Sequence, residues 1–444
     1  MRVLVVGNGG REHALCWKLR QSPELSELFC APGNPGIARL ADCVPIGADE
    51  VRALADFAQE AKIDLTVVGP ELPLTLGIVD EFKGRGLAVF GPSRAAAELE
   101  GSKAYAKSFL ARHGIPTARF RFAHDRGEAE RAAAEFGLPV VLKADGLAAG
   151  KGVIVATDAA ELEAGLVALY DERRFGTAAD IVVVEEFLTG EEVSLLALVD
   201  GRRLLPFATA RDYKRLLDGD QGPNTGGMGA HSPSGVLDGR SASDALERIL
   251  YPTVEALADE GRPFVGVLYA GLMLTADGAK VLEYNVRMGD PEAQALLLRL
   301  EDDLLPILAA GAAGSFGVSR LHFRKEASAV VVLASRGYPE RPAKGESIEG
   351  LDAAERHPGV VVFHAGTQAV DGRVVATGGR VLNVGATGPD LATALVRAYG
   401  AAGEIRWPAK ILRTDIGRRL VEQVEPAAET GSFDLRQIPI DELP

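Results

Sequence analysis

The chain has 444 residues, of which 47% are hydrophobic and 25% are charged, and its formal net charge at pH 7 is -14. This composition is typical of a globular protein of about two to four domains. The acidic balance argues against a nucleic-acid-binding surface, although it does not exclude a local basic pocket.

Other features of the sequence argue for a cytoplasmic protein. The three cysteines, Cys16, Cys30 and Cys43, lack the C-x-x-C spacing of zinc sites and show no disulfide framework, which favours a reducing compartment. The first residues read as a strand and not as a signal peptide, and no apolar run approaches the roughly 20 residues that span a bilayer. We therefore expect a cytoplasmic protein with no membrane or nucleic-acid partner, and a monomer as its assembly.

Residues 1–101 alternate short apolar runs with segments of helical spacing. The runs "RVLVVG", "DLTVVGPE" and "LAVFGP" end in turn residues, and "VRALADFAQEA" has helical periodicity. This alternation predicts a parallel sheet with crossover helices. Ligands of such sheets lie beyond the carboxyl ends of the strands, which is where residues 7–13 and 69–74 are placed.

Residues 102–325 have a different pattern, which predicts an α+β domain. Ser102 is placed as the N-cap of a helix that stops at Gly114. Longer strands follow, and Asp277-Gly278 is a strong signal for the turn of a hairpin. A third unit of strands and one helix covers residues 326–422, and residues 423–444 form an acidic, proline-containing tail that we expect to be weakly structured.

The glycines near the N-terminus fail the test for a dinucleotide-binding fold. That fingerprint needs glycine at its first, third and sixth positions, and here these are Gly7, Gly9 and Glu12. The remaining strand, turn and helix N-terminus at Gly9, Gly10 and Arg11 favours an anion. A tight turn that only packs helix on strand is the equal alternative.

A glycine-rich loop follows Lys143 in "KADGLAAGKGV". It is not a Walker loop, because only three residues separate Gly146 from Gly150 and Gly152 stands where Ser or Thr should bind magnesium. Lys143 and Lys151 could nevertheless reach the same phosphates. On this motif alone, a flexible hairpin with solvated lysines is the better-supported alternative.

Four acids follow the apolar run of residues 181–184. Glu185, Glu186, Glu191 and Glu192 are costly directly after a buried strand unless they find partners. A nucleotide could supply partners, since a hinge can bind adenine and an acid can accept hydrogen bonds from ribose hydroxyls. A charged surface turn is the commoner meaning of such a cluster.

The segment "VLEYNVRMGDPEAQ" favours a functional site. Glu283 and Asn285 are two apart on a predicted strand and therefore share a face. A carboxylate and an amide oxygen suit magnesium that bridges nucleotide phosphates, and we expect Arg287 on the same face to hold a phosphoryl group. The polar, glycine-rich residues 211–233 are predicted to form a long loop suited to a small ligand.

Together these motifs resemble the ATP-grasp superfamily and, within it, the glycinamide ribonucleotide synthetase family. The resemblance runs from "GNGGREH" through "GPNTGGMGAHSP" and "EYNVRMGDPE" to "RVLNV", and so covers nearly the whole chain. The sequence departs at Met288, where the family usually has Phe or Leu. It also departs in "YAGLMLT", which lacks the earlier acidic metal ligand of many ATP-grasp enzymes.

The resemblance implies a multidomain α/β and α+β fold. Residues 1–101 would form an N-terminal parallel α/β domain for the sugar phosphate, and residues 102–325 would form a central ATP-grasp domain with a flap at about 120–189. A small C-terminal α+β domain would follow. The implied ATP-binding residues are Lys103, Lys143, Gly150, Lys151, Glu185, Glu186, Phe187, Leu188 and Glu192. The implied substrate-binding residues are Gly9, Gly10, Arg11, Glu71, Asp212, Asn224, Thr225, Gly226, Gly227 and Met228. The implied catalytic residues are Lys151, Arg287 and Asp290, and the implied metal ligands are Glu283 and Asn285.

The resemblance also implies a reaction. ATP, glycine and phosphoribosylamine would give ADP, phosphate and glycinamide ribonucleotide through a glycyl phosphate, in de novo purine biosynthesis, with ATP and Mg²⁺ or Mn²⁺ as cofactors. The alternatives are another ATP-grasp carboxylate–amine ligase or a carboxylase, a nucleotide-binding module that no longer catalyses, and a dehydrogenase that only the opening stretch suggests.

Overall fold

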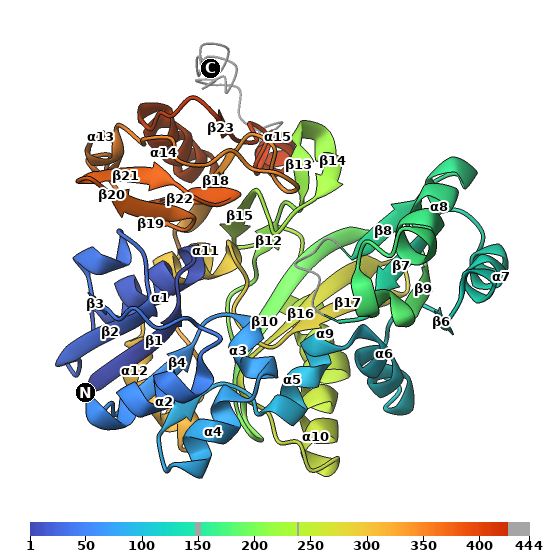
Figure 1. The fold of residues 1–444 in the computed structure, drawn as a ribbon, viewed down its shortest axis with the longest axis horizontal. Coiled ribbons are helices and arrows are strands. Elements are labelled where there is room, and N and C mark those ends of the chain that lie inside the picture. Colours follow the sequence, from blue (N-terminus) through green and yellow to red (C-terminus); the bar gives the residue numbers. More distant parts are fainter. Residues whose placement is uncertain (147–151, 238, 425–444) are drawn as a thin grey trace.

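The computed structural model describes residues 1–146, 152–237 and 239–424, and Figure 1 shows how their helices and strands are arranged. The N-terminal part has the parallel sheet that the alternating pattern predicts. Its order is β3-β2-β1-β4-β5, with every pairing parallel. The strands are β1 (Arg2–Gly7), β2 (Glu27–Pro32), β3 (Asp42–Cys43), β4 (Leu65–Val68) and β5 (Val89–Phe90). The helices are α1 (Gly10–Leu19), α2 (Val51–Glu60), α3 (Glu71–Thr75), α4 (Ile78–Gly84) and α5 (Arg94–Gly101).

A small antiparallel sheet lies at the right of Figure 1, apart from the N-terminal sheet. Its order is β6-β9-β7-β8. Its elements are β6 (Phe120–Ala123), α7 (Arg126–Phe136), β7 (Val140–Ala144), β8 (Val153–Ala156), α8 (Ala159–Leu166) and β9 (Val182–Glu186). Its apolar residues, among them Leu142, Leu166 and Val184, form a core of their own. We call this unit the flap sheet.

The long strands in the middle of the chain form a second antiparallel sheet in the order β11-β10-β16-β17. They are β10 (Glu191–Asp200), β11 (Leu204–Pro206), β16 (Val265–Thr275) and β17 (Gly278–Asn285). The predicted hairpin and the predicted helix start are both confirmed: Gly278 begins β17, and the Ser102 hydroxyl accepts a hydrogen bond from the Tyr105 N–H at 3.0 Å. The helices are α6 (Lys103–Arg112), α9 (Gly239–Ala245), α10 (Tyr251–Asp259), α11 (Glu292–Arg299) and α12 (Leu304–Ala312).

The C-terminal sheet, at the top of Figure 1, has the order β12-β15-β18-β22-β19, and β23 adds to β18. Its strands are β12 (Arg211–Asp212), β15 (Gly229–Ser232), β18 (Ala327–Ser335), β19 (Val360–His364), β22 (Arg380–Gly388) and β23 (Lys410–Ile411). A hairpin of β20 (Thr367–Val370) and β21 (Arg373–Ala376) accompanies it, with helices α13 (Leu351–Glu355), α14 (Leu391–Glu404) and α15 (Arg418–Val424).

The prediction of one long loop over residues 211–233 was wrong. Strands β12 and β15 belong to the C-terminal sheet, and β15 pairs antiparallel with β18. Between them, β13 (Arg215–Leu217) and β14 (Gln221–Asn224) form a hairpin. The small residues Gly229 and Ala230 are buried against β18. This segment is a strand because it pairs with β18, and not because its residues are hydrophobic.

Three of the expectations from the sequence concern residues that the structure does not describe. Gly150 and Lys151 lie outside the described residues, as do residues 425–444 of the predicted tail. Among the helices that the structure describes, none has the length and apolar character needed to cross a membrane.

Candidate functional site

The turn between β1 and α1 is closed by Glu12, the residue that replaces the third glycine of the dinucleotide fingerprint. The Glu12 carboxylate accepts a hydrogen bond from the Gly9 N–H at 2.6 Å. A side chain at Gly7 or Gly69 would collide with Glu12. The turn is therefore packed around a carboxylate and forms a compact corner, in which Gly10 and Arg11 are buried.

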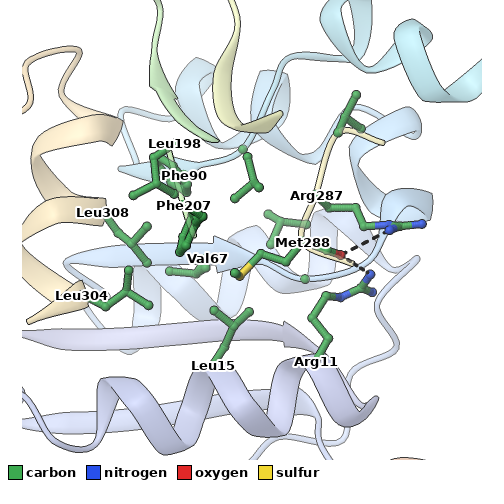
Figure 2. A pocket seen from close by; sticks show the side chains of 15 residues that line it. Arg11, Leu15, Val67, Phe90, Leu198, Phe207, Arg287, Met288, Leu304 and Leu308 are labelled. Carbon is green, nitrogen blue, oxygen red and sulfur yellow. Dashed lines mark hydrogen bonds between the residues drawn. The ribbon is translucent and has the colours of Figure 1, made fainter. Parts of the chain in front are cut away.

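The guanidinium group of Arg11 lies near that of Arg287, which comes from the central part of the chain. Both guanidinium groups donate to the carbonyl oxygen of Met288, at 3.1 and 3.2 Å, and they lie at one end of an apolar cavity of about 20 Å³, room for roughly one water molecule. Figure 2 shows the two arginines beside the cavity, which is otherwise lined by side chains such as Leu15, Phe90 and Met288.

Two acids hold Arg287 in place. Its guanidinium lies 3.2 Å from Glu71 and 2.8 Å from Glu100. Burial raises the pKa of Glu71, but the charges of Arg287 and Arg11 outweigh burial and bring it down to about 2. Burial raises the pKa of Glu100 to about 7 in spite of Arg287. Arg287 lies beyond the end of β17 and not on the strand. Its ion pairs with Glu71 and Glu100 link the N-terminal and central parts of the molecule.

Lys103 and Lys143 point toward the junction of the central sheet and the flap sheet. The Lys103 ammonium donates to the Gly146 carbonyl at 2.8 Å, and the Lys143 ammonium donates to the Leu282 carbonyl at 2.9 Å. Burial lowers the pKa of Lys103. Lys143 also lies 3.0 Å from Glu185, which is 2.9 Å from the buried ammonium of Lys107. The Glu185 carboxylate thus lies between two lysines.

The other residues predicted to bind adenine and ribose lie along the same junction. The Glu186 carboxylate pairs with Arg119 at 2.7 Å. Phe187 is 40% exposed, whereas Leu188 is buried. Glu192 pairs with Lys214, so the predicted ribose acid already has a cation beside it.

Glu283 and Asn285 share one face of β17, as predicted. Tyr284 between them points to the opposite face, where its hydroxyl meets that of Thr253 at 2.5 Å. Burial raises the pKa of Glu283, but the charges of Lys214, Lys143, Lys103 and Arg287 outweigh it and lower the pKa, so the carboxylate is ionised at neutral pH. No group of three or more His, Cys, Asp or Glu side chains suited to a metal occurs among the described residues.

A buried polar network lies next to this face. Tyr269 on β16 donates to Glu292 at 2.5 Å and meets the Ser194 hydroxyl at 2.9 Å. Burial raises the pKa of Asp212 well above its usual range, although Lys214 opposes this. Lys214 keeps a raised pKa in spite of burial, because Glu192, Asp212 and Glu283 surround it.

The predicted substrate segment meets the turn at Asp290. Thr225 is anchored to the Lys214 carbonyl at 2.8 Å, and the Gly226 carbonyl accepts from Arg380 at 2.6 Å. Arg380 also lies 3.4 Å from the Asp290 carboxylate. Met228 is fully buried, and its backbone N–H and C=O are both bonded within the protein. It therefore supports the segment from beneath, while Gly226 is exposed, Asn224 is half-buried and Gly227 is buried against Pro291.

The predicted residues thus gather in two neighbouring groups. Lys103, Lys143, Glu192, Glu283 and Asn285 lie at the junction with the flap sheet. The second group joins Gly9, Gly10, Arg11, Glu71, Arg287 and Asp290. Burial raises the pKa of Asp290, but the charges of Arg380, Arg11 and Arg287 and a hydrogen bond from Gln294 outweigh it and lower the pKa.

Several residues of the site escaped the sequence analysis: Glu100, Lys107, Lys214, Tyr269 and Arg380. Two of them carried a usable signal: "RDYKR" places Lys214 between polar residues on a glycine-rich segment, and Arg380 begins the motif "RVLNV". The others are single charged or aromatic residues in ordinary helices and strands, and only the fold brings them together.

Comparison with protein families and relatives agrees along the chain. The phosphoribosylglycinamide synthetase models match as an N domain over residues 1–100, an ATP-grasp (A) domain over residues 101–293 and a C domain over residues 328–419. A phosphoribosylamine–glycine ligase from Mesorhizobium japonicum is 50% identical over 421 residues, which is 95% of this chain and 99% of that protein. Another from Salmonella typhimurium is 48% identical over 427 residues, with 95% and 99% covered.

Solved structures give the same result. The crystal structure of phosphoribosylamine–glycine ligase from Thermotoga maritima superposes with a TM-score of 0.79 and 35% identity, and 93% of this chain and 99% of that chain are covered. A biotin carboxylase from Campylobacter jejuni has a TM-score of 0.71 at 15% identity, covering 93% and 92%, and so shows a similarity of fold alone.

Proposed function

This chain belongs to the phosphoribosylglycinamide synthetase family, and from that membership and the geometry of the site we propose which of its residues bind ATP, glycine and phosphoribosylamine. The enzyme is an ATP-dependent ligase that joins glycine to phosphoribosylamine to give glycinamide ribonucleotide, ADP and phosphate. The observation that carries the residue assignment is the ionised Glu283, which lies 3.6 Å from Lys214 and whose pKa the charges of Lys214, Lys143, Lys103 and Arg287 lower against burial.

The chemistry explains the need for these cations. A glycine carboxylate does not react with an amine unaided, because its oxygen is a poor leaving group. Transfer of a phosphoryl group from ATP to this oxygen gives glycyl phosphate and ADP, and attack by the amine of phosphoribosylamine then forms the amide and releases phosphate. Lys103, Lys143 and Arg287 would stabilise the charge that develops on the transferring group. We also assign Lys151 and Gly150 to the phosphates.

The adenosine moiety would lie at the junction of the flap sheet and β10. Glu185, Glu186, Phe187 and Leu188 follow the buried part of β9 and would form the adenine hinge, and the exposed ring of Phe187 is free to cover a base. Glu192, which pairs with Lys214, would accept from the ribose hydroxyls. The flap sheet would exclude water, which would otherwise hydrolyse the acyl phosphate.

The residues of the site also fit a divalent metal ion. Glu283 and Asn285 offer one carboxylate and one amide oxygen on one face, a donor set that suits Mg²⁺ or Mn²⁺ when nucleotide phosphates supply the other ligands. When bound, such an ion would neutralise phosphate charge. Lys214 lies 3.6 Å from Glu283 and helps to keep this carboxylate ionised, as a metal ligand must be.

The sugar amine and glycine would lie between the two arginines and the Asp290 turn. Gly9, Gly10 and Arg11 would bind the phosphate of phosphoribosylamine at the N-terminus of α1. Glu71 and Asp290 would orient the amine, and Asp212, Asn224, Thr225, Gly226 and Gly227 would hold glycine, with Met228 as support. Arg287 and Asp290 would act closest to the reacting groups.

Three further proposals follow from the sequence. We propose functional units at residues 1–101, 102–325, with a flap at about 120–189, and 326–422. We propose that the enzyme works in the cytoplasm as a monomer, which light scattering at the mass of one chain would support.

An omission assay tests the function. ADP release should require both glycine and phosphoribosylamine, because the acyl phosphate forms on one and is consumed by the other. Undiminished ADP release without either compound would overturn the proposal. Release that depends on bicarbonate in place of glycine would favour a carboxylase.

A further inference from the structure

We propose that Arg380, from the C-terminal sheet, is a positioning residue for the ligase reaction: it fastens the Gly226–Gly227 segment to the Asp290 turn. This inference rests on the proposed function, which places substrate at both of these segments. It adds β22 of the C-terminal sheet to the machinery of the site, where the assignments above use only residues before position 293.

The contacts of Arg380 carry the inference. Its Nη1 donates to three carbonyl oxygens, those of Gly226 at 2.6 Å, Gly227 at 3.4 Å and Asp290. Its Nη2 lies 3.4 Å from the Asp290 carboxylate. One side chain thus joins two turns that are more than 60 residues apart in the sequence. The side chain is only 20% exposed, so water competes weakly for these bonds.

The backbone of the segment is fitted to this guanidinium. A Cβ at Gly226 would lie 3.0 to 3.3 Å from the Arg380 guanidinium atoms, so the glycine lets the backbone approach closely. Gly227 has a φ of +112°, and a Cβ there would lie 2.6 Å from Pro291. The two turns therefore meet directly, and the planar fork of an arginine can bond to both at once in a way that a lysine cannot.

The C-terminal sheet supplies a second contact to the same segment. The Tyr338 hydroxyl accepts a hydrogen bond from the Gly226 N–H at 3.0 Å. With Arg380 on the carbonyl and Tyr338 on the N–H, both polar groups of Gly226 are fixed. The N–H of Gly227 is bonded to Thr225 at 3.0 Å. These bonds fix the shape of the segment, so that a substrate beside it would meet the same surface in one orientation.

Arg413 provides a contrasting case in the same part of the molecule. It is 1% exposed and bonds to Asp220, Asp415 and the Arg215 carbonyl, at the far side of the hairpin of β13 and β14. Arg413 touches neither the Gly226–Gly227 segment nor the Asp290 turn in these contacts. Its replacement should therefore lower stability, whereas replacement of Arg380 should change the kinetics.

Steady-state kinetics of Arg380→Ala and Arg380→Lys test the proposal, with Arg373→Ala, an exposed arginine of the neighbouring β20-β21 hairpin, as the control. Arg380→Ala should lower kcat/KM for glycine and for phosphoribosylamine by about 10- to 100-fold, the size expected for lost charge-assisted hydrogen bonds. The affinity for ATP should stay unchanged, since Arg380 contacts none of the ATP residues. Arg380→Lys should be intermediate, and added guanidinium should restore part of the activity of Arg380→Ala.

Hydrogen exchange of peptides that cover residues 222–230 gives a readout that does not depend on the reaction. Their exchange should become faster in Arg380→Ala and stay unchanged in Arg373→Ala. Wild-type kinetics and unchanged exchange would overturn the proposal, as would a parallel loss of ATP affinity with no rescue by guanidinium. If the wild type shows no glycine-dependent ADP release but exchange still rises in Arg380→Ala, the function fails while the fastening role stands. If Arg380→Ala does not fold, Arg380→Lys carries both measurements.

Discussion

Single residues decide what the first turn of the chain can bind. Glu12 fills the space behind Gly7 and Gly69 and bonds to the Gly9 N–H. The dinucleotide fingerprint needs a glycine at this position. The identity of one side chain therefore reduces the ligand expected at this turn from a dinucleotide to a single phosphate.

Gly69→Ala should disturb this corner. The added methyl group would collide with the Glu12 carboxylate, and overpacking of this kind costs about 1–3 kcal/mol of unfolding free energy. Gly84→Ala is the matched control, because a Cβ at Gly84 meets nothing within 4 Å. Urea denaturation checks both, and equal midpoints for the two variants would contradict the packing argument.

Glu283→Gln should abolish most of the ligase activity with the fold intact. The change removes the charge that lies among four cations but keeps the shape of the side chain. We expect a fall in kcat of about 100-fold or more, comparable to the loss of one electrostatic group in other active sites. Glu255→Gln, an exposed residue of α10, is the control. Coupled ADP-release assays measure the rate, and wild-type turnover would remove Glu283 from the metal site.

At the scale of elements, α1 packs against β19 through two buried histidines. The His13 ring accepts a hydrogen bond from the His364 N–H at 2.8 Å, and the rings lie 5.8 Å apart. Burial, together with the neighbouring His364 and Arg39, lowers the pKa of His13 to about 3. Burial also lowers the pKa of His364 to about 4, although Glu355 opposes this and Arg39 adds to it.

This contact should make stability fall as the pH falls below about 6.5. The unfolded chain then binds protons that the folded histidines do not, so unfolding becomes more favourable in the window between about pH 6.5 and pH 4. At pH 5.5 each histidine lowers the free energy of unfolding by about 1 kcal/mol relative to its value above pH 6.5. Above pH 6.5 both states are neutral and the effect vanishes.

His13→Asn tests this dependence, because the Asn side-chain oxygen can replace the ring nitrogen as acceptor. Thermal unfolding between pH 7.5 and 5.5 should show a smaller loss of stability, by about 1 kcal/mol, in this variant than in the wild type. The exposed His124, changed to Asn, is the control. An unchanged slope in His13→Asn would exclude the buried pair as the cause.

Some elements and residues could be predicted from the sequence because their pattern is local. The alternation in "VLEYNV" placed Glu283 and Asn285 on one face, and Ser102 could be identified as an N-cap from its neighbours. The strand at residues 229–232 could not, since its sequence is small and polar and it is held by pairing with β18, about 100 residues later. Lys107, Lys214 and Arg380 were missed for the same reason: their partners are distant in the chain.

At the scale of the whole molecule, the flap sheet is the most independent unit. Among the residues that the structure describes, its apolar core contains none from outside residues 123–184. Its polar links to the rest include the Lys107–Glu185 ion pair and the hydrogen bond from Lys143 to the Leu282 carbonyl. A unit with a small core of its own opens at a lower free energy than the larger cores beside it.

Hydrogen exchange should show directly that the flap sheet opens at a lower free energy than the other sheets. Amides of β7 and β9 should exchange faster than those of β1 and β18 in the absence of substrates, and ATP should slow the former selectively. Mass spectrometry of exchanged peptides measures both. Equal protection of the flap sheet and the C-terminal sheet without ATP would show that the molecule opens as one unit.

The origin of β12 and β15 has a consequence for engineering. Two strands of the C-terminal sheet are encoded before residue 233, far from the rest of that sheet. A hybrid enzyme made by joining two relatives at a single crossover near residue 326 would therefore pair strands from different parents across β15 and β18. Recombination should respect this by exchanging residues 211–232 together with the C-terminal part, so that both sides of the shared ladder, and Arg380 with the Gly226–Gly227 segment that it contacts, come from one parent.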